Sequence, residues 1–253
     1  MQLPLSIISL FLALLTAHVV GDFVLQTAGE ANRKHRIPVL VRHAAIVAAL
    51  SYLLAGNWQM WEIPLLVLVS HAVIDRIKAA VGGRSARGFL LDQLVHVAAI
   101  AGIVLLVTTL RSPQAGYGVA LLGNTYLRVL VFFSGAVLTI RAGGFLIGLA
   151  VQPLLSQVEN LENRQGATIT GGLKGGGQLI GQLERALVFL FILMNQPAAV
   201  GFLITAKSMF RFGEIKDSQQ RMLAEYIIVG TLMSFGYGIF LSYLTRLALD
   251  ALA

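Results

Sequence analysis

The sequence of 253 residues has no cysteine and few charged residues. The absence of cysteine excludes disulfide bonds, thiolate metal ligands and cysteine nucleophiles. Only 12% of the residues are charged, whereas soluble domains carry about 25%. So few charged residues could not cover the surface of a soluble protein of this size. A disordered chain is excluded as well, because 57% of the residues are hydrophobic. The remaining class is an integral membrane protein with several spans.

Long apolar runs recur along the chain, each close to the roughly 20 residues that a helix needs to cross a bilayer. They predict an all-α membrane protein with seven or eight transmembrane helices. We expect these helices at residues 4–25, 37–55, 61–81, 88–110, 127–151, 178–195 and 222–246. A shorter run at 197–206 fits a tilted span, a re-entrant hairpin or a half-helix. No basic segment or small-residue cleavage site accompanies the first run, so we expect a retained helix and not a cleaved signal peptide.

The basic residues are unevenly distributed between the predicted loops. With eight spans, 16 of the 19 lysines and arginines share one side, in segments 26–42, 76–87, 141–185 and 207–221. Cytoplasmic loops carry such an excess, so this side is predicted to be cytoplasmic and the N-terminus to lie outside. Topology therefore explains the net charge of +7, and nucleic acid is not an expected partner.

Two helical units are expected. Residues 1–110 should form a four-helix membrane unit, which holds four of the five histidines in its helices and the fifth, His35, in a loop. Residues 120–253 should form a second helical unit, with a polar, glycine-rich cytoplasmic loop at 156–178. Three of the five aspartates also lie in the first unit, so most groups capable of chemistry are there.

Histidines and aspartates of the first unit are paired at a spacing of four residues. This spacing places both side chains of a pair on one helical face, one turn apart. Three such pairs and one further histidine fall near the cytoplasmic ends of their predicted helices, so a four-helix cluster would bring all of them to one level. These seven groups are His18, Asp22, His43, His71, Asp75, Asp92 and His96.

Ionisable groups inside membrane spans are costly and by default mark function. We therefore predict that the seven groups bind divalent metal, in one crowded site or as two ions about 3.5–4 Å apart. Imidazole and carboxylate without thiolate suit Zn²⁺, with Mn²⁺ or Fe²⁺ as alternatives. Asp75 or Asp92 would be the catalytic base, and Asp22 or Asp75 could instead orient a histidine without touching the metal. The competing interpretation of each pair is a capped helix end or an interfacial charge.

Further polar residues are candidates for binding a substrate. Five flank the histidine cluster, and four lie in the second unit, where they would form either an ion-pair network or a pocket for an anionic headgroup. They are Gln26, Arg33, Lys34, Lys78, Gln93, Glu184, Arg185, Lys207 and Arg211. Glu184 lies within a predicted span, so it is expected to have a cationic partner among the other three residues of the second unit.

The motifs around these residues carry a family resemblance. In the first half they are His18-Val19-Val20-Gly21-Asp22-Phe23-Val24-Leu25-Gln26, His43, His71-x3-Asp75-x2-Lys78 and Asp92-Gln93-x2-His96. In the second half they are Gly181-x-Leu183-Glu184-Arg185, Ala206-Lys207-Ser208, Arg211-Phe212 and Glu225-Tyr226-x3-Gly230-Thr231-Leu232. Over nearly the whole chain this pattern resembles a bacterial family known as domain of unknown function 3307, which implies the bacterial inner membrane but no settled activity. The first half is also similar in style to small inner-membrane proteins described as metal-dependent hydrolases.

Two functions are expected from the cluster. The first is an integral membrane metal-dependent hydrolase at the cytoplasmic interface, acting on a phosphorylated or lipid-linked anionic substrate among the membrane lipids. The second is a divalent metal-ion transporter that uses the two His-x3-Asp pairs. Transport sites tend to lie near the midplane, whereas His18 is expected only roughly 12 Å from its helix end, which favours the hydrolase. A metal-stabilised structural or regulatory protein is the third alternative.

Overall fold

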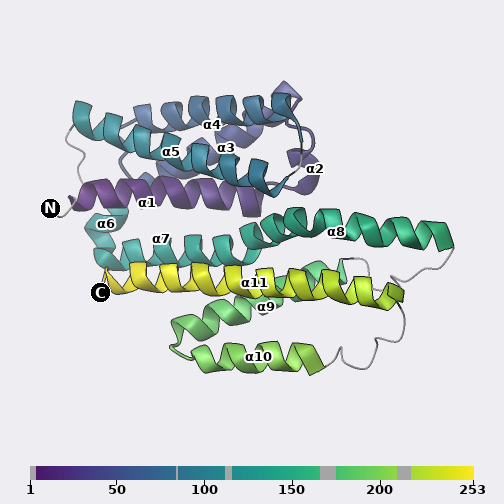
Figure 1. The fold of residues 1–253 in the computed structure, drawn as a ribbon. Helices are drawn as coiled ribbons and strands as arrows, with labels where there is room; N and C mark the ends of the chain where they lie inside the picture. Colours follow the sequence, from purple (N-terminus) through teal and green to yellow (C-terminus); the bar gives the residue numbers. More distant parts are fainter. Residues whose placement is uncertain (1–3, 84, 112–115, 166–174, 210–217) are drawn as a thin grey trace. The chain divides into compact units, whose positions relative to one another are not determined.

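The computed structural model describes residues 4–83, 85–111, 116–165, 175–209 and 218–253. Every regular element in these ranges is helical, so the predicted all-α class is confirmed for the described part of the chain. The elements are α1 Leu5–Val20, the π-helix η1 Gly21–Leu25, α2 Ala28–Ala31, α3 Ile37–Ala55, α4 Glu62–Val81, α5 Ala86–Leu110, α6 Tyr117–Leu122, α7 Asn124–Val137, the π-helix η2 Leu138–Ala142, α8 Gly143–Gln165, α9 Gly176–Leu193, α10 Pro197–Met209 and α11 Ser218–Asp250 (Figure 1).

A helix occupies each of the eight predicted apolar runs, but not every helix is equally suited to a membrane. Six helical stretches among the described residues are long and apolar enough to cross one. These are Leu5–Leu25, Ile37–Ala55, Ala86–Leu110, Asn124–Gln157, Gly176–Leu193 and Ala224–Asp250. Helix α4 is not among them because three charged residues gather near its end, and α10 has only 13 residues.

The first compact unit comprises residues 1–137 and 248–253, so it contains the expected 1–110 unit together with α6 and α7. Four of its helices form a closed ring, in which α1 and α4 each pack against both α3 and α5. The interior of the ring is filled by buried aliphatic side chains such as Leu14, Val47, Ile63 and Val104. Four-helix bundles often build ligand sites from side chains on facing helices, and this ring has that arrangement.

Local sequence signals explain how the chain forms the ring. A Cβ atom on Gly21 would lie 2.6 Å from Val47 Cγ2, so glycine allows η1 to approach α3 closely. The Gln26 N–H donates to the Gly21 carbonyl at 3.1 Å, the i to i+5 bond of a π-helix. Gly56 ends α3 with a φ of +61°, and Ser85 caps α5 by accepting a bond from a backbone N–H of its first turn. The two tight turns bring the paired histidines and aspartates to one end of the bundle.

The second compact unit comprises residues 138–247. Helix α9 packs against η2, α8 and α10, around a core of Val188, Ile192, Val200 and Phe235. The expected loop at 156–178 is shorter than predicted, because α8 continues to residue 165 and α9 begins at residue 176. Residues 156–165 contain two glutamates, two glutamines, one leucine and one arginine, which are good helix formers. Residues 166–174 of that loop lie outside the described residues.

Candidate metal centre

The structure brings all seven predicted groups together inside the ring of α1, α3, α4 and α5. They form three overlapping sets, and in each set one donor atom from every residue lies within 4.8 Å of the others. The sets are His18, His71 and His96; Asp22, His43 and His71; and Asp75, Asp92 and His96. His71 joins the first two sets and His96 joins the first and third. The groups are therefore one continuous cluster, while their role as metal ligands stays a prediction.

The set of Asp22, His43 and His71 has the geometry of one face of a coordination tetrahedron. Asp22 Oδ1 lies 3.1 Å from His43 Nε2 and 3.3 Å from His71 Nε2. The two Nε2 atoms are 3.0 Å apart. Tetrahedral zinc sites with bonds of about 2.0–2.1 Å place neighbouring ligand atoms about 3.3 Å apart. Asp75 Oδ2 is a fourth donor nearby, 3.5 Å from His71 Nε2 and 3.7 Å from His43 Nε2.

Hydrogen bonds determine which ring nitrogen of His96 and of His18 carries the proton. His96 Nδ1 lies 2.9 Å from the Asp92 carbonyl oxygen, which can only accept, so Nδ1 is protonated. The Gln93 amide donates to Asp92 Oδ2 at 3.1 Å and turns its oxygen toward His18 Nε2, at 3.2 Å. His18 Nε2 therefore donates to Gln93. The lone pairs of His18 Nδ1 and His96 Nε2 are left available.

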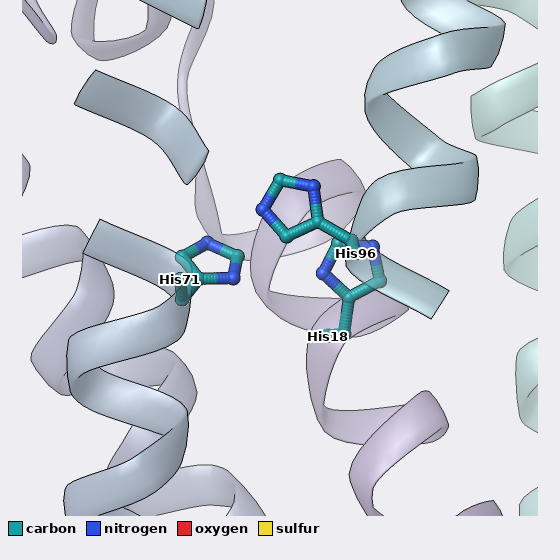
Figure 2. A group of neighbouring side chains, drawn as sticks. All are labelled: His18, His71 and His96. Carbon is teal, nitrogen blue, oxygen red and sulfur yellow. The ribbon is translucent and has the colours of Figure 1, made fainter. Parts of the chain in front are cut away.

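These two nitrogens are buried without a hydrogen-bond partner among the described residues. Figure 2 shows the imidazoles of His18, His71 and His96 converging from α1, α4 and α5. The His96 ring centroid lies 4.6 Å from that of His71 and 4.7 Å from that of His18. Buried polar atoms without partners are costly, and the lone pair of each of these nitrogens is available to coordinate a divalent ion.

Asp75 and Asp92 each pair with a lysine. Lys34 Nζ lies 2.7 Å from Asp75 Oδ2, and both side chains are buried. Lys78, which is exposed, donates to Asp92 Oδ2 at 2.5 Å. The Oδ1 atom of each aspartate is buried and accepts no hydrogen bond in the described part of the chain. Each carboxylate therefore has one oxygen on an ammonium group and one oxygen still available.

Lys34 is expected only as one of several polar residues that flank the cluster, and its buried contact with Asp75 is not predicted from the sequence. It lies in the segment between α2 and α3, beside other basic residues and next to the exposed His35. A basic loop gives no sign of which side chain turns inward, because the positive-inside rule explains all of them equally well. The exposure of His35 agrees with its expected position in a loop.

A small cavity of about 10 Å³, enough for about one water molecule, adjoins the histidines. Its walls beyond the imidazoles are mostly apolar, with two serines. The lining residues there are Leu14, Val47, Ser51, Val67, Ser70, Ile74, Ala99, Ile100 and Ile103. The cluster therefore has room for a water beside its nitrogens, and the wall behind that water offers few polar groups.

Three predicted residues form a separate group within the second unit. Lys207 donates to Glu184 Oε2 at 2.6 Å, so the expected cationic partner of Glu184 is Lys207. Arg185 donates to the Ile140 carbonyl oxygen of η2 at 3.0 and 3.2 Å and to Ser234 Oγ at 2.9 Å. Arg211 lies outside the described residues. Both interpretations of this group, an ion-pair network and an anion pocket, stay predictions.

The comparison with known families agrees with the pattern of the first unit. Residues 10–117 match the family DUF3307, described as a protein of unknown function. The DUF3307 segment contains all seven clustered groups and both lysines that pair with them, so the resemblance predicted for the first half is confirmed. The match ends at residue 117, and the predicted extension into the second half stays a prediction. No curated protein and no solved structure matches the chain.

Proposed function

We propose that the chain is a multi-pass protein of the bacterial inner membrane, with seven or eight spans. Support comes from the outward helix faces, where large apolar side chains such as Leu94, Leu110 and Phe202 are 64–77% exposed. Exposed apolar surface on this scale marks contact with lipid or a partner. Helix α4 must cross if α3 and α5 do, because the connections at 56–61 and 82–85 are short. The positive-inside rule, applied to the basic segments, supports a cytoplasmic position for the cluster and an outer position for the N-terminus.

The absence of cysteine makes this orientation directly measurable. A single cysteine introduced as Trp61→Cys, in the exposed connection before α4, should react with a membrane-impermeant maleimide in intact spheroplasts. A single cysteine introduced as His35→Cys should react only after the membrane is opened. The opposite labelling pattern would overturn the orientation. Labelling of both sites in intact spheroplasts would contradict the proposal that α3, which lies between them, crosses the membrane.

We further propose that the first unit is a metal-dependent hydrolase. The observation that carries this proposal is the triangle of Asp22 Oδ1, His43 Nε2 and His71 Nε2, with edges of 3.0–3.3 Å. Catalytic metal sites use three protein ligands and keep one position for water or substrate. A divalent ion held by these three atoms would activate water and polarise a phosphoryl or acyl oxygen.

The neighbouring residues have roles that follow from their contacts. The available Oδ1 atom of Asp92 makes it the general base, since Oδ2 is already held by Lys78 and Gln93. Lys78 is the exposed cation of the cluster and offers an anionic substrate a point charge at the edge of the bundle. A phosphorylated or lipid-linked substrate at the cytoplasmic interface matches this placement. Zn²⁺ is the metal we favour, with Mn²⁺ or Fe²⁺ compatible with the same ligands.

A divalent-ion transporter is supported less well. Transport needs a polar route from the cluster toward the opposite side of the membrane. The residues behind the histidines are instead mostly aliphatic, from Leu14 and Val47 to Ile103, and the cavity between them holds about one water. The described residues therefore favour a site that opens toward one side.

Hydrolysis can be tested on purified protein loaded with Zn²⁺, Mn²⁺ or Fe²⁺. We expect turnover of a lipid phosphate or a soluble phosphomonoester that a chelator abolishes and the metal restores. Asp92→Asn should lower kcat by about 100-fold or more, because a general base contributes roughly 10²–10⁴. Glu62→Gln is the matched control, because Glu62 lies at the start of α4, whereas the cluster residues of α4 lie toward its opposite end. Absence of turnover over a broad substrate panel, with metal flux in proteoliposomes above protein-free vesicles, would favour transport.

A further inference from the structure

We propose that Asp75, Asp92 and His96 form a second divalent-metal position, and that Lys34 and Lys78 supply the positive charge that its ion would bring. The proposal rests on the metal centre proposed above and defines how many ions that centre holds. The three residues offer donor atoms within 4.8 Å of one another. Three of their donors have neither a hydrogen bond nor an ion pair with a lysine among the described residues: Asp75 Oδ1, Asp92 Oδ1 and His96 Nε2.

Asp75 is placed to bridge the two positions. Its Oδ2 atom lies 3.5 and 3.7 Å from the Nε2 atoms of His71 and His43, which belong to the first position. The same residue belongs to the set with Asp92 and His96. A carboxylate shared by two ligand sets is what a two-metal centre needs, since its ions lie only about 3.5–4 Å apart.

The two lysines supply the charge that a second ion would bring. The three aspartates of the cluster carry a charge of −3, and the two ammonium groups reduce it to −1. One divalent ion then gives +1, which a hydroxide or an anionic substrate neutralises. A second divalent ion would raise the charge to +3 with both lysines in place, and uncompensated buried charge is costly. The wild-type centre therefore takes one ion.

The positions of the lysines agree with this substitution. Lys34 Nζ lies 2.7 Å from Asp75 Oδ2 and is enclosed in the bundle, although lysine is rarely buried without a partner. Lys78 Nζ lies 2.5 Å from Asp92 Oδ2 and reaches the site from the surface. Both carboxylates of the second position are thus paired with a cation. Asp22 of the first position has no lysine or arginine within 4.0 Å among the described residues, so the first position is the one left open to an ion.

Metal stoichiometry tests the proposal without an activity assay. Wild type and variants are purified, dialysed against Zn²⁺ or Mn²⁺ and analysed by elemental mass spectrometry. Wild type should contain one equivalent per chain, and Lys34→Met/Lys78→Met should contain two. The Mn²⁺ form of the double variant should also give a magnetically coupled EPR signal that wild type lacks. Lys34→Met/Asp75→Asn keeps the wild-type charge but removes the bridging carboxylate, so this matched control should contain one equivalent.

The outcomes separate the two proposals. Wild type with no more metal than His71→Ala would overturn the metal centre itself. One equivalent in wild type and still one in Lys34→Met/Lys78→Met would overturn only the second position. Two equivalents in wild type would overturn the claim that the two lysines replace its ion. If the double variant does not fold, Lys78→Met decides, because Lys78 is exposed. Its second equivalent should bind at least tenfold more tightly than any second equivalent in wild type, and equal affinity would contradict the proposal.

Discussion

His71→Ala is expected to lower the affinity for a divalent ion by more than about 100-fold and to abolish metal-dependent turnover. His71 Nε2 lies 3.0 Å from His43 Nε2 and 3.3 Å from Asp22 Oδ1, and His71 is shared by two of the three ligand sets. Loss of a residue that only supports a metal ligand already costs about 10–100-fold in affinity. The loss of a shared ligand should cost more. Competition titration against a chromophoric chelator measures the change.

His35→Ala is the matched control for this experiment, because it removes an exposed imidazole only one residue from the buried Lys34. It should bind metal as wild type does. Circular dichroism and size-exclusion chromatography must show that both variants keep the helical fold. A folded His71→Ala protein with wild-type affinity would mean that the cluster is held together by hydrogen bonds alone, and the proposed hydrolase would lose its metal.

The positions of the histidines and aspartates could be predicted because two simple regularities determine them. Spacing of four residues places a pair on one helical face, and the hydropathy pattern gives the depth of each pair along its helix. Short connections then force neighbouring helices to run antiparallel, so groups near alternate helix ends meet at one level. Four helices packed in a ring have one interior, and seven costly polar groups share it.

Other features of the site depend on geometry that the sequence pattern does not contain. The inward turn of Lys34 follows from the path of the segment between η1 and α3, which no periodicity describes. The π-helix η1 begins at Gly21, which approaches Val47 closely, a contact between residues 26 positions apart. The three charged residues near the end of α4 exclude it from the helices that are apolar enough to cross a membrane, although Asp75 and Lys78 belong to the site.

The second unit gives the other large expected effect, which separates a structural ion pair from a substrate pocket. Glu184→Leu alone should destabilise the protein by about 3 kcal/mol or more, because removal of one partner leaves the other buried charge uncompensated. The Lys207 and Glu184 side chains are only 19% and 12% exposed, and their charged atoms are 2.6 Å apart. Lys207 Nζ also lies 5.8 Å from the ring centroid of Phe235. Its charge therefore has an aromatic face but no second carboxylate within 4.0 Å among the described residues.

The double variant Glu184→Leu/Lys207→Met should recover most of this stability, since apolar residues of similar volume often replace a buried ion pair without loss. Thermal unfolding in detergent, followed by circular dichroism, measures both variants, with the exposed Thr205→Ala on α10 as the control. If the ion pair serves only to hold α9 and α10 together, the stable double variant should keep wild-type turnover. A double variant that is stable but no longer hydrolyses its anionic substrate would instead place Glu184 and Lys207 in the substrate site.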